Sequence, residues 1–96
     1  MKYRVLETYT PEDQQEDRSR RTAEFESDHT DLVELAFLAR VACYDCEVSE
    51  TTRDNIRALF EASDVAEQLA DQEAVGFGFV LFGDSGEWCL EVDAVG

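Results

Sequence analysis

The pattern of apolar and polar residues predicts a strand at each end of the chain. Residues 2–9, KYRVLETY, alternate and are rich in Tyr and Val, as expected for a half-buried strand. Near the C-terminus, the strand-like runs VGFGFVLF and EWCLEVDAV flank the tetrapeptide GDSG, which is the pattern of a β-hairpin. In the last run, strand geometry places Glu87, Cys89, Glu91 and Asp93 on one face, opposite an apolar face.

Helical signals fill the middle of the chain. In the stretch TPED, Thr10 suits a helix N-cap and Pro11 suits the first helical position. Residues 11–26 contain few apolar side chains, so we expect a solvated helix or a partly mobile arm there. Residues 31–46 have apolar side chains on most sides, which predicts a central helix.

Two further helices are predicted before the hairpin. The stretch SETTRD has Thr51 and Asp54 in capping-box positions, and Ser63 suits the cap of a short helix reaching about residue 73. The order of strand, helices and hairpin predicts one α+β domain over residues 1–96. We expect a three-stranded antiparallel sheet, formed by the N-terminal strand and the C-terminal hairpin and covered by three to four helices.

Short motifs with catalytic or metal-binding meaning lack the context that they need. GDSG resembles the nucleophile motif of trypsin-like proteases, but the chain is far too short, and a hairpin turn explains the same residues. Cys43 and Cys46 could form a zinc site with Cys89 and His29, although core packing is the simpler interpretation. We therefore predict a protein that is not an enzyme, with no catalytic residue, metal site or cofactor. The alternative is a small hydrolase with an unrecognised carboxylate or cysteine site.

Charge changes this picture most. The 96 residues include 23 Asp and Glu against 8 Lys and Arg, which gives a net charge of −15. Such a charge argues against direct binding to nucleic acid and against docking on an anionic membrane. The sequence also lacks a signal-peptide core and an apolar run of about 20 residues, so we expect a cytoplasmic protein.

The charge is unevenly distributed, because the sequence contains no basic residue after Arg57 to offset the carboxylates there. A net charge of −15 equals that of about 25 Å of DNA duplex, which is close to the ~30 Å diameter expected of a domain this size. We therefore expect a surface that binds a basic protein or nucleoprotein complex. The residues predicted to form it are Glu61, Asp64, Glu67, Asp71, Glu87, Glu91 and Asp93.

In size, charge and lack of a catalytic motif, the chain resembles small acidic proteins of phages and mobile elements that block host defence, including anti-CRISPR proteins and other DNA mimics. The resemblance implies a non-enzymatic inhibitor that occupies a basic nucleic-acid-binding surface of a defence nuclease or CRISPR effector complex. It would act in the host cytoplasm without a cofactor. Two alternatives remain, namely an acidic adaptor or toxin-neutralising domain with one basic partner, and a domain adapted to high salt.

Strand order decides the role of the carboxylates in the last strand. If the first strand pairs beside it, Lys2 and Arg4 can lie opposite Glu91 and Asp93 as ordinary cross-strand pairs. The binding surface would then move to the helices. If the last strand lies at an edge, its carboxylates discourage pairing between sheets and are available to a basic partner.

Overall fold

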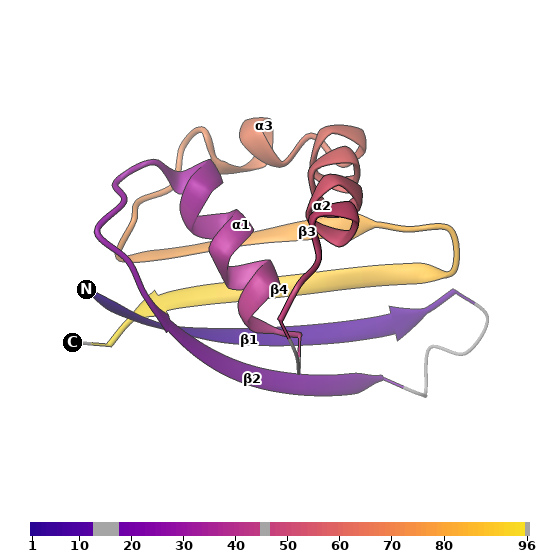
Figure 1. Cartoon of the computed structure of the whole chain (residues 1–96), viewed down its shortest axis with the longest axis horizontal. Helices are drawn as coiled ribbons and strands as arrows, with labels where there is room; N and C mark the ends of the chain where they lie inside the picture. The colour runs from indigo at the N-terminus through magenta and orange to yellow at the C-terminus, as the bar shows by residue number, and fades with distance from the viewer. Residues whose placement is uncertain (13–17, 45–46, 96) are drawn as a thin grey trace.

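The structure, a computed structural model, describes residues 1–12, 18–44 and 47–95. These residues form an α+β fold with four antiparallel strands, ordered β2-β1-β4-β3, and three helices (Figure 1). The strands are β1 (Lys2–Pro11), β2 (Ser19–Glu26), β3 (Gly76–Phe82) and β4 (Gly86–Ala94). The helices are α1 (Leu32–Ala42), α2 (Glu50–Ala62) and α3 (Val65–Leu69).

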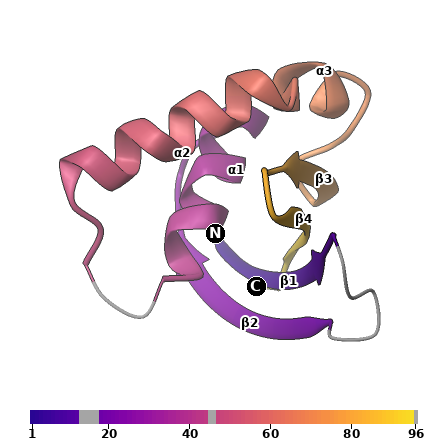
Figure 2. The same cartoon turned by 90° about the vertical axis from the view of Figure 1, so that its right-hand side faces the viewer.

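The sheet curves around α1, and the three helices lie on its concave side (Figure 2). Alternating residues of β1 and β4 point into the core, where Val5, Leu90 and Val92 have no exposed surface. From α1, Leu35 and Ala39 are equally buried against them. The convex face of the sheet carries no helix from the described part of the chain, so its side chains face the solvent.

The predicted three-stranded sheet is wrong, because residues 19–26 add a fourth strand beside β1. Tyr3 lies opposite Phe25, and their rings stack with centroids 5.1 Å apart. Val5 lies opposite Ala23 in the same register. Only these two residues of β2 bring apolar side chains inward, so the sequence pattern was too weak to indicate a strand. Pairing with β1 outweighs local helix preference in this segment.

The start of the predicted helix over residues 11–26 is also different. Thr10 and Pro11 end β1 instead of capping a helix, and Glu12 follows β1 in a bend. Glu12 donates its backbone N–H to the Ser85 carbonyl oxygen at 3.0 Å, which ties the end of β1 to the hairpin turn. Residues 13–17 of this segment lie outside the described residues.

The starts of α1 and α2 follow capping rules, but the cap of α2 differs from the prediction. Asp31 caps α1 by accepting a hydrogen bond from the Val33 N–H at 3.1 Å. The cap of α2 is Ser49, whose hydroxyl accepts from the Thr52 N–H at 3.2 Å, so the predicted capping box at Thr51 is wrong. Helix α1 ends at Ala42, earlier than the predicted residue 46, and its C-cap is Cys43.

The chain turns sharply between α2 and α3 at Asp64. This residue has left-handed backbone angles (φ 53°, ψ 45°), which interrupt the helical segment. The predicted cap of α3 by Ser63 is wrong, because the Ser63 hydroxyl instead accepts a hydrogen bond from the Phe82 N–H of β3 at 3.0 Å. The short helix α3 is therefore held against the edge of β3.

Two glutamine side chains close that edge of the sheet. The Gln72 amide donates to the Gly78 carbonyl oxygen and accepts from the Gly78 N–H, both at 2.7 Å. The Gln68 amide forms the same pair of bonds with Val80, at 2.9 and 2.8 Å. Each amide thus replaces the hydrogen bonds that a neighbouring strand would make.

The C-terminal hairpin is confirmed. The Gly83 N–H donates to the Gly86 carbonyl oxygen at 2.9 Å and closes the turn between β3 and β4. A Cβ atom on Gly86 would lie 2.4 Å from the Thr10 carbonyl oxygen, so the close approach of β1 requires glycine there. The tetrapeptide GDSG is therefore a turn, as the hairpin interpretation predicted.

Candidate partner-binding surface

The predicted carboxylates of β4 lie on the convex face of the sheet. Strand alternation sends Glu87, Glu91 and Asp93 to this face, and all three are exposed. β4 is an inner strand between β1 and β3, so it is not the edge strand that one of the two alternatives required. The role of its carboxylates therefore depends on what lies opposite them.

Only one of the three carboxylates faces a basic residue across the strands. Arg4 of β1 lies opposite Asp93, whereas Glu91 lies opposite Leu6 and Gly78. Glu87 likewise lies between Thr10 and Phe82 in the register of the sheet. No ion pair between described residues reaches any of these three carboxylates.

The basic side chains of β1, Lys2 and Arg4, instead form ion pairs with Glu24 of β2. The Lys2 Nζ atom lies 2.9 Å from a Glu24 carboxylate oxygen, and Arg4 Nη2 lies 3.9 Å from the other oxygen. This hydrogen bond and the attraction of the opposite charges raise the pKa of Lys2 and lower the pKa of Glu24. The positive charge of β1 is therefore shared mainly with β2, which leaves β4 acidic.

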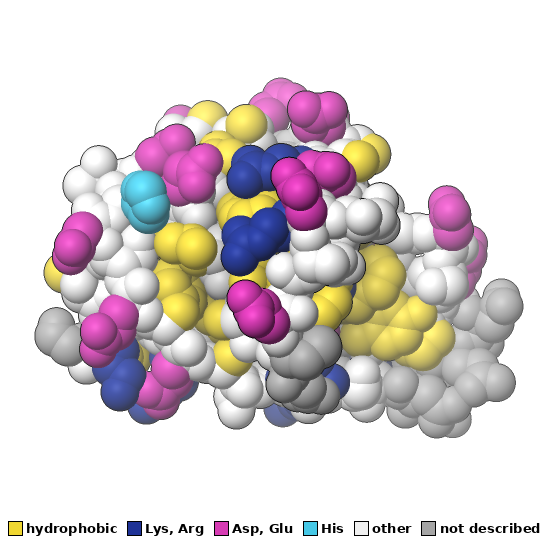
Figure 3. All heavy atoms as spheres, in the orientation of Figure 1, with side chains coloured by type: hydrophobic (Ala, Val, Ile, Leu, Met, Phe, Trp, Pro, Cys, Tyr) yellow, Lys and Arg dark blue, Asp and Glu magenta, His cyan; other side chains and the backbone are white. Residues whose placement is uncertain are grey.

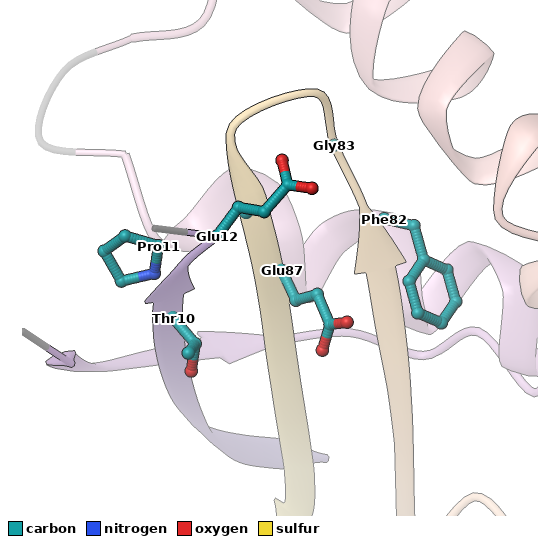
Figure 4. A pocket seen from close by; sticks show the side chains of 7 residues that line it. Thr10, Pro11, Glu12, Phe82, Gly83 and Glu87 are labelled. Atoms are coloured by element: carbon teal, nitrogen blue, oxygen red, sulfur yellow. The ribbon is translucent and has the colours of Figure 1, made fainter. Parts of the chain in front are cut away.

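The end of the hairpin adds one carboxylate that the sequence analysis missed. Glu12 and Glu87 line a hollow near the turn, and Figure 4 shows both side chains extending on the same side of the hairpin. The aromatic ring of Phe82 lies beside Glu87 in the same view. Glu12 reaches this place because β1 is longer than predicted. The remaining residues that line the hollow are Thr10, Pro11, Gly83 and Gly86.

Glycines of β3 leave the other two carboxylates of β4 uncovered. Glu91 and Asp93 line a shallow hollow together with Gln72 and two glycines, Gly76 and Gly78. A Cβ atom on Gly76 would lie 3.3 Å from an Asp93 carboxylate oxygen. Any larger side chain at these positions would cover part of the acidic surface, so the glycines keep it open.

The predicted helix carboxylates form a second group on the other side of the sheet. Glu61, Asp64 and Glu67 lie around one hollow whose apolar wall comes from α1, α2 and α3. The wall consists of Val33, Phe60, Val65 and Ala66. Asp71 lies beyond the end of α3 and does not line this hollow. The turn at Asp64 brings three of the four predicted helix residues together.

Six of the seven predicted residues therefore lie on two surfaces, and Asp71 lines none of the hollows described. One surface is on the helical layer and contains Glu61, Asp64 and Glu67. The other is on the convex face of the sheet and contains Glu87, Glu91 and Asp93. The molecule measures 38 × 30 × 25 Å. The two surfaces lie on opposite sides of it. Figure 3, which views the helical layer, shows acidic side chains mainly around its rim and basic side chains near its centre. On that layer, the guanidinium groups of Arg53 and Arg57 lie 5.9 and 4.3 Å from the centre of the Phe37 ring.

A buried ion pair under α1 was not predicted. Arg40 Nη1 lies 2.6 Å from Glu7 Oε2, and the two side chains are 12% and 11% exposed. The Arg40 guanidinium also lies between the rings of Tyr44 and Trp88, 5.0 and 5.4 Å from their centres. The sequence did contain a signal for this pair. Side chains two residues apart on a strand point to the same face, so Glu7 had to point inward with Tyr3 and Val5.

Cys43 lies beside this ion pair as a buried thiol. Its side chain is 2% exposed and donates a hydrogen bond to the Ala39 carbonyl oxygen at 3.4 Å. Burial, and then the negative charge of Glu7, raise the pKa of Cys43 to about 12. A thiol that remains protonated at neutral pH is a poor nucleophile. The core-packing interpretation of Cys43 agrees with this geometry.

The zinc alternative finds no support in the described residues. Cys43 is buried on the helical side of the sheet, whereas Cys89 is exposed on the convex side. His29 is exposed in the connection between β2 and α1, and Cys46 lies outside the described residues. No group of three or more possible metal ligands occurs among the residues described.

Comparison with protein-family models, curated proteins and solved structures finds no match to this chain. Within its described residues, none of the helices combines the length and the apolar character needed to cross a membrane. The α+β fold and the two acidic surfaces are therefore the basis for a functional proposal.

Proposed function

We propose that the protein binds a basic surface of another protein through the hollow bounded by Glu61, Asp64 and Glu67. The observation that supports this function is the combination of three exposed carboxylates with the apolar wall of the hollow. Lys and Arg side chains need both features, because their aliphatic stems favour apolar contact while their charged ends favour carboxylates. The hollow therefore fits one or two long basic side chains of a partner.

The partner that we favour is a basic surface which otherwise holds nucleic acid, as in a defence nuclease or a CRISPR effector complex. Binding there would block nucleic acid by occupation and would require no catalytic group. The net charge of −15 supports this choice, because it steers the protein towards strongly basic surfaces. The carboxylates of β4 would add to this steering from the convex face.

The binding test compares two triple variants with the same change in charge. E61Q/D64N/E67Q neutralises the hollow, and asparagine at position 64 tolerates the left-handed backbone found there. E47Q/E50Q/D54N neutralises three exposed carboxylates before and within the first turns of α2 as a control. Binding of a fluorescent arginine-rich peptide, and displacement of single-stranded DNA from a CRISPR effector complex, are the measurements.

The hollow variant should weaken peptide binding by about 10- to 100-fold relative to the control, because each exposed charge contributes up to ~1 kcal/mol. Equal weakening in both variants would show that net charge acts without the hollow. Retained peptide binding with no displacement of DNA would leave the hollow as a basic-protein site and reject the nucleic-acid-competing role.

Adaptation to high salt predicts a different result. If the acidity serves binding, the melting temperature should change with KCl mainly below ~0.15 M. At that concentration the Debye length is ~8 Å, so repulsion between surface carboxylates is already largely screened. A melting temperature that continues to rise steeply in molar KCl would favour the halophile alternative. Circular dichroism across a KCl series measures this directly.

A further inference from the structure

The outer edge of β2 exposes backbone hydrogen-bonding groups. The Met1 N-terminus donates to the Ser27 carbonyl oxygen, and the Ser27 N–H donates to the Met1 carbonyl oxygen, both at 3.0 Å. This pair sets the phase of the antiparallel ladder, so every second residue from Ser27 backwards bonds to β1. The backbone groups of Arg20, Thr22 and Glu24 therefore point away from the sheet.

No described residue covers this edge. Outside β1, the described part of the chain makes no hydrogen bond to the backbone of Arg20, Thr22 or Glu24. The opposite edge of the sheet is closed, because Gln68 and Gln72 satisfy the backbone of β3. A strand with free N–H and C=O groups is a template for another strand, and β2 is the edge that offers it.

The side chains of β2 are complementary to themselves. The residues that share its convex face are two arginines, then threonine, then two glutamates, in the order Arg18, Arg20, Thr22, Glu24 and Glu26. We propose that β2 pairs antiparallel with β2 of a second copy of this chain, about a two-fold axis at Thr22. This pairing places Arg20 opposite Glu24 of the other copy and Arg18 opposite Glu26 of the other copy.

The charge pattern favours this register over its neighbours. An axis at Ala23 would still pair Arg20 with Glu26, but it would leave Glu24 opposite an uncharged threonine. An axis at Arg20 would place two identical arginines opposite each other, and an axis at Glu24 would do the same with two glutamates. An axis at Arg21 would also oppose like charges. With the axis at Thr22, Glu24 lies between Arg4 of its own chain and Arg20 of the other, so the signs alternate across the joint.

The same edge is where two such acidic chains repel each other least. Five of the eight basic residues of the chain belong to β1, β2 or the residue before β2, namely Lys2, Arg4, Arg18, Arg20 and Arg21. Elsewhere the approach of two copies with a net charge of −15 each is opposed by their charge. The dimer would have one eight-stranded sheet, with the β4 carboxylates of both copies on its convex face.

The test measures the oligomeric state by sedimentation equilibrium, from low micromolar to near-millimolar protein at physiological salt. The wild-type chain should pass from monomer to dimer across this range. T22P should remain a monomer with an unchanged circular dichroism spectrum, because proline removes an N–H that the monomer does not use. T22V keeps that N–H and should dimerise as the wild type does.

A charge exchange tests whether opposite charges hold the two β2 strands together. R18E/R20E and E24R/E26R each oppose like charges in the proposed dimer, so each alone should remain monomeric. An equimolar mixture restores all four pairs and should form a one-to-one heterodimer. A wild-type monomer at every concentration, including one whose β2 edge binds a strand of another protein, would overturn the proposal. Dimerisation of T22P, or a mixture that stays monomeric, would equally overturn it.

Discussion

The buried pair of Arg40 and Glu7 allows a quantitative test of how this small fold tolerates charge in its core. R40M keeps most of the side-chain volume at that position but leaves the Glu7 carboxylate without its 2.6 Å partner at about one-tenth exposure. An unpaired buried charge costs about 3–5 kcal/mol. The whole domain is expected to be stable by only about 5–14 kcal/mol, so this single change should consume much of its stability.

The double variant E7L/R40M separates the charge from the packing. It replaces both charged groups with apolar ones, and such replacements are often neutral or stabilising. We expect its free energy of unfolding to lie within about 1 kcal/mol of the wild-type value. R53M makes the same substitution at an exposed arginine of α2 and should cost less than about 1 kcal/mol.

Urea unfolding measures these differences through the fluorescence of Trp88, which lies 5.4 Å from the Arg40 guanidinium, and through circular dichroism. A loss of 3 kcal/mol corresponds to a fall in melting temperature of at least ~12 °C for a domain of this size. If E7L/R40M is destabilised as much as R40M, the unpaired charge is not the cause. The loss would then come from the packing of Arg40 between its aromatic neighbours.

Three further predictions concern the thiols and the closed edge of the sheet. Partial burial and then the charge of Glu91 raise the pKa of Cys89, so E91Q should speed its alkylation by iodoacetamide severalfold, measured by peptide mass spectrometry. The pKa of the Cys43 thiol rises from 9.0 to about 12 on folding. The protonated thiol therefore contributes fully to the free energy of unfolding below pH 9, and this contribution is lost as the pH rises towards 12. Between these values, urea unfolding should show wild-type stability falling about 1.4 kcal/mol per pH unit more steeply than that of C43A; parallel curves would contradict this. Q68A/Q72A removes four hydrogen bonds to the edge of β3 and should lower the free energy of unfolding in urea by about 2–4 kcal/mol. It should also promote aggregation, measured by light scattering. Unchanged stability would show that water replaces both amides.

Elements with a regular apolar period were predictable from the sequence, and those defined by their partners were not. The first strand, the central helix and the hairpin carry the two- or 3.6-residue pattern through most of their length. β2 does not, because its outward positions are polar and its inward ones include Arg21, which donates to the Cys43 carbonyl oxygen. Its extended conformation depends on β1, so no local signal could separate it from a solvated helix.

The candidate surface was likewise predictable from the sequence only in part. Alternation correctly placed Glu87, Glu91 and Asp93 on one face, since this requires only that the segment is a strand. Whether a base lies opposite them depends on register, which the sequence pattern did not contain. The helix carboxylates meet around a hollow because the chain turns at Asp64, although a continuous helix would also have placed them on a common side.

The protection of the β3 edge comes from α3 and from the segment that follows it. Gln68 belongs to α3, whereas Gln72 lies beyond Leu69, the last residue of that helix. Gln68 addresses Val80 and Gln72 addresses Gly78, two residues apart on β3, with one amide each. The spacing is visible in the sequence, but it acquires meaning only when β3 is known to be an outer strand. The order β2-β1-β4-β3 makes it so, and the same order places the charge-complementary residues of β2 at the edge that no described side chain closes.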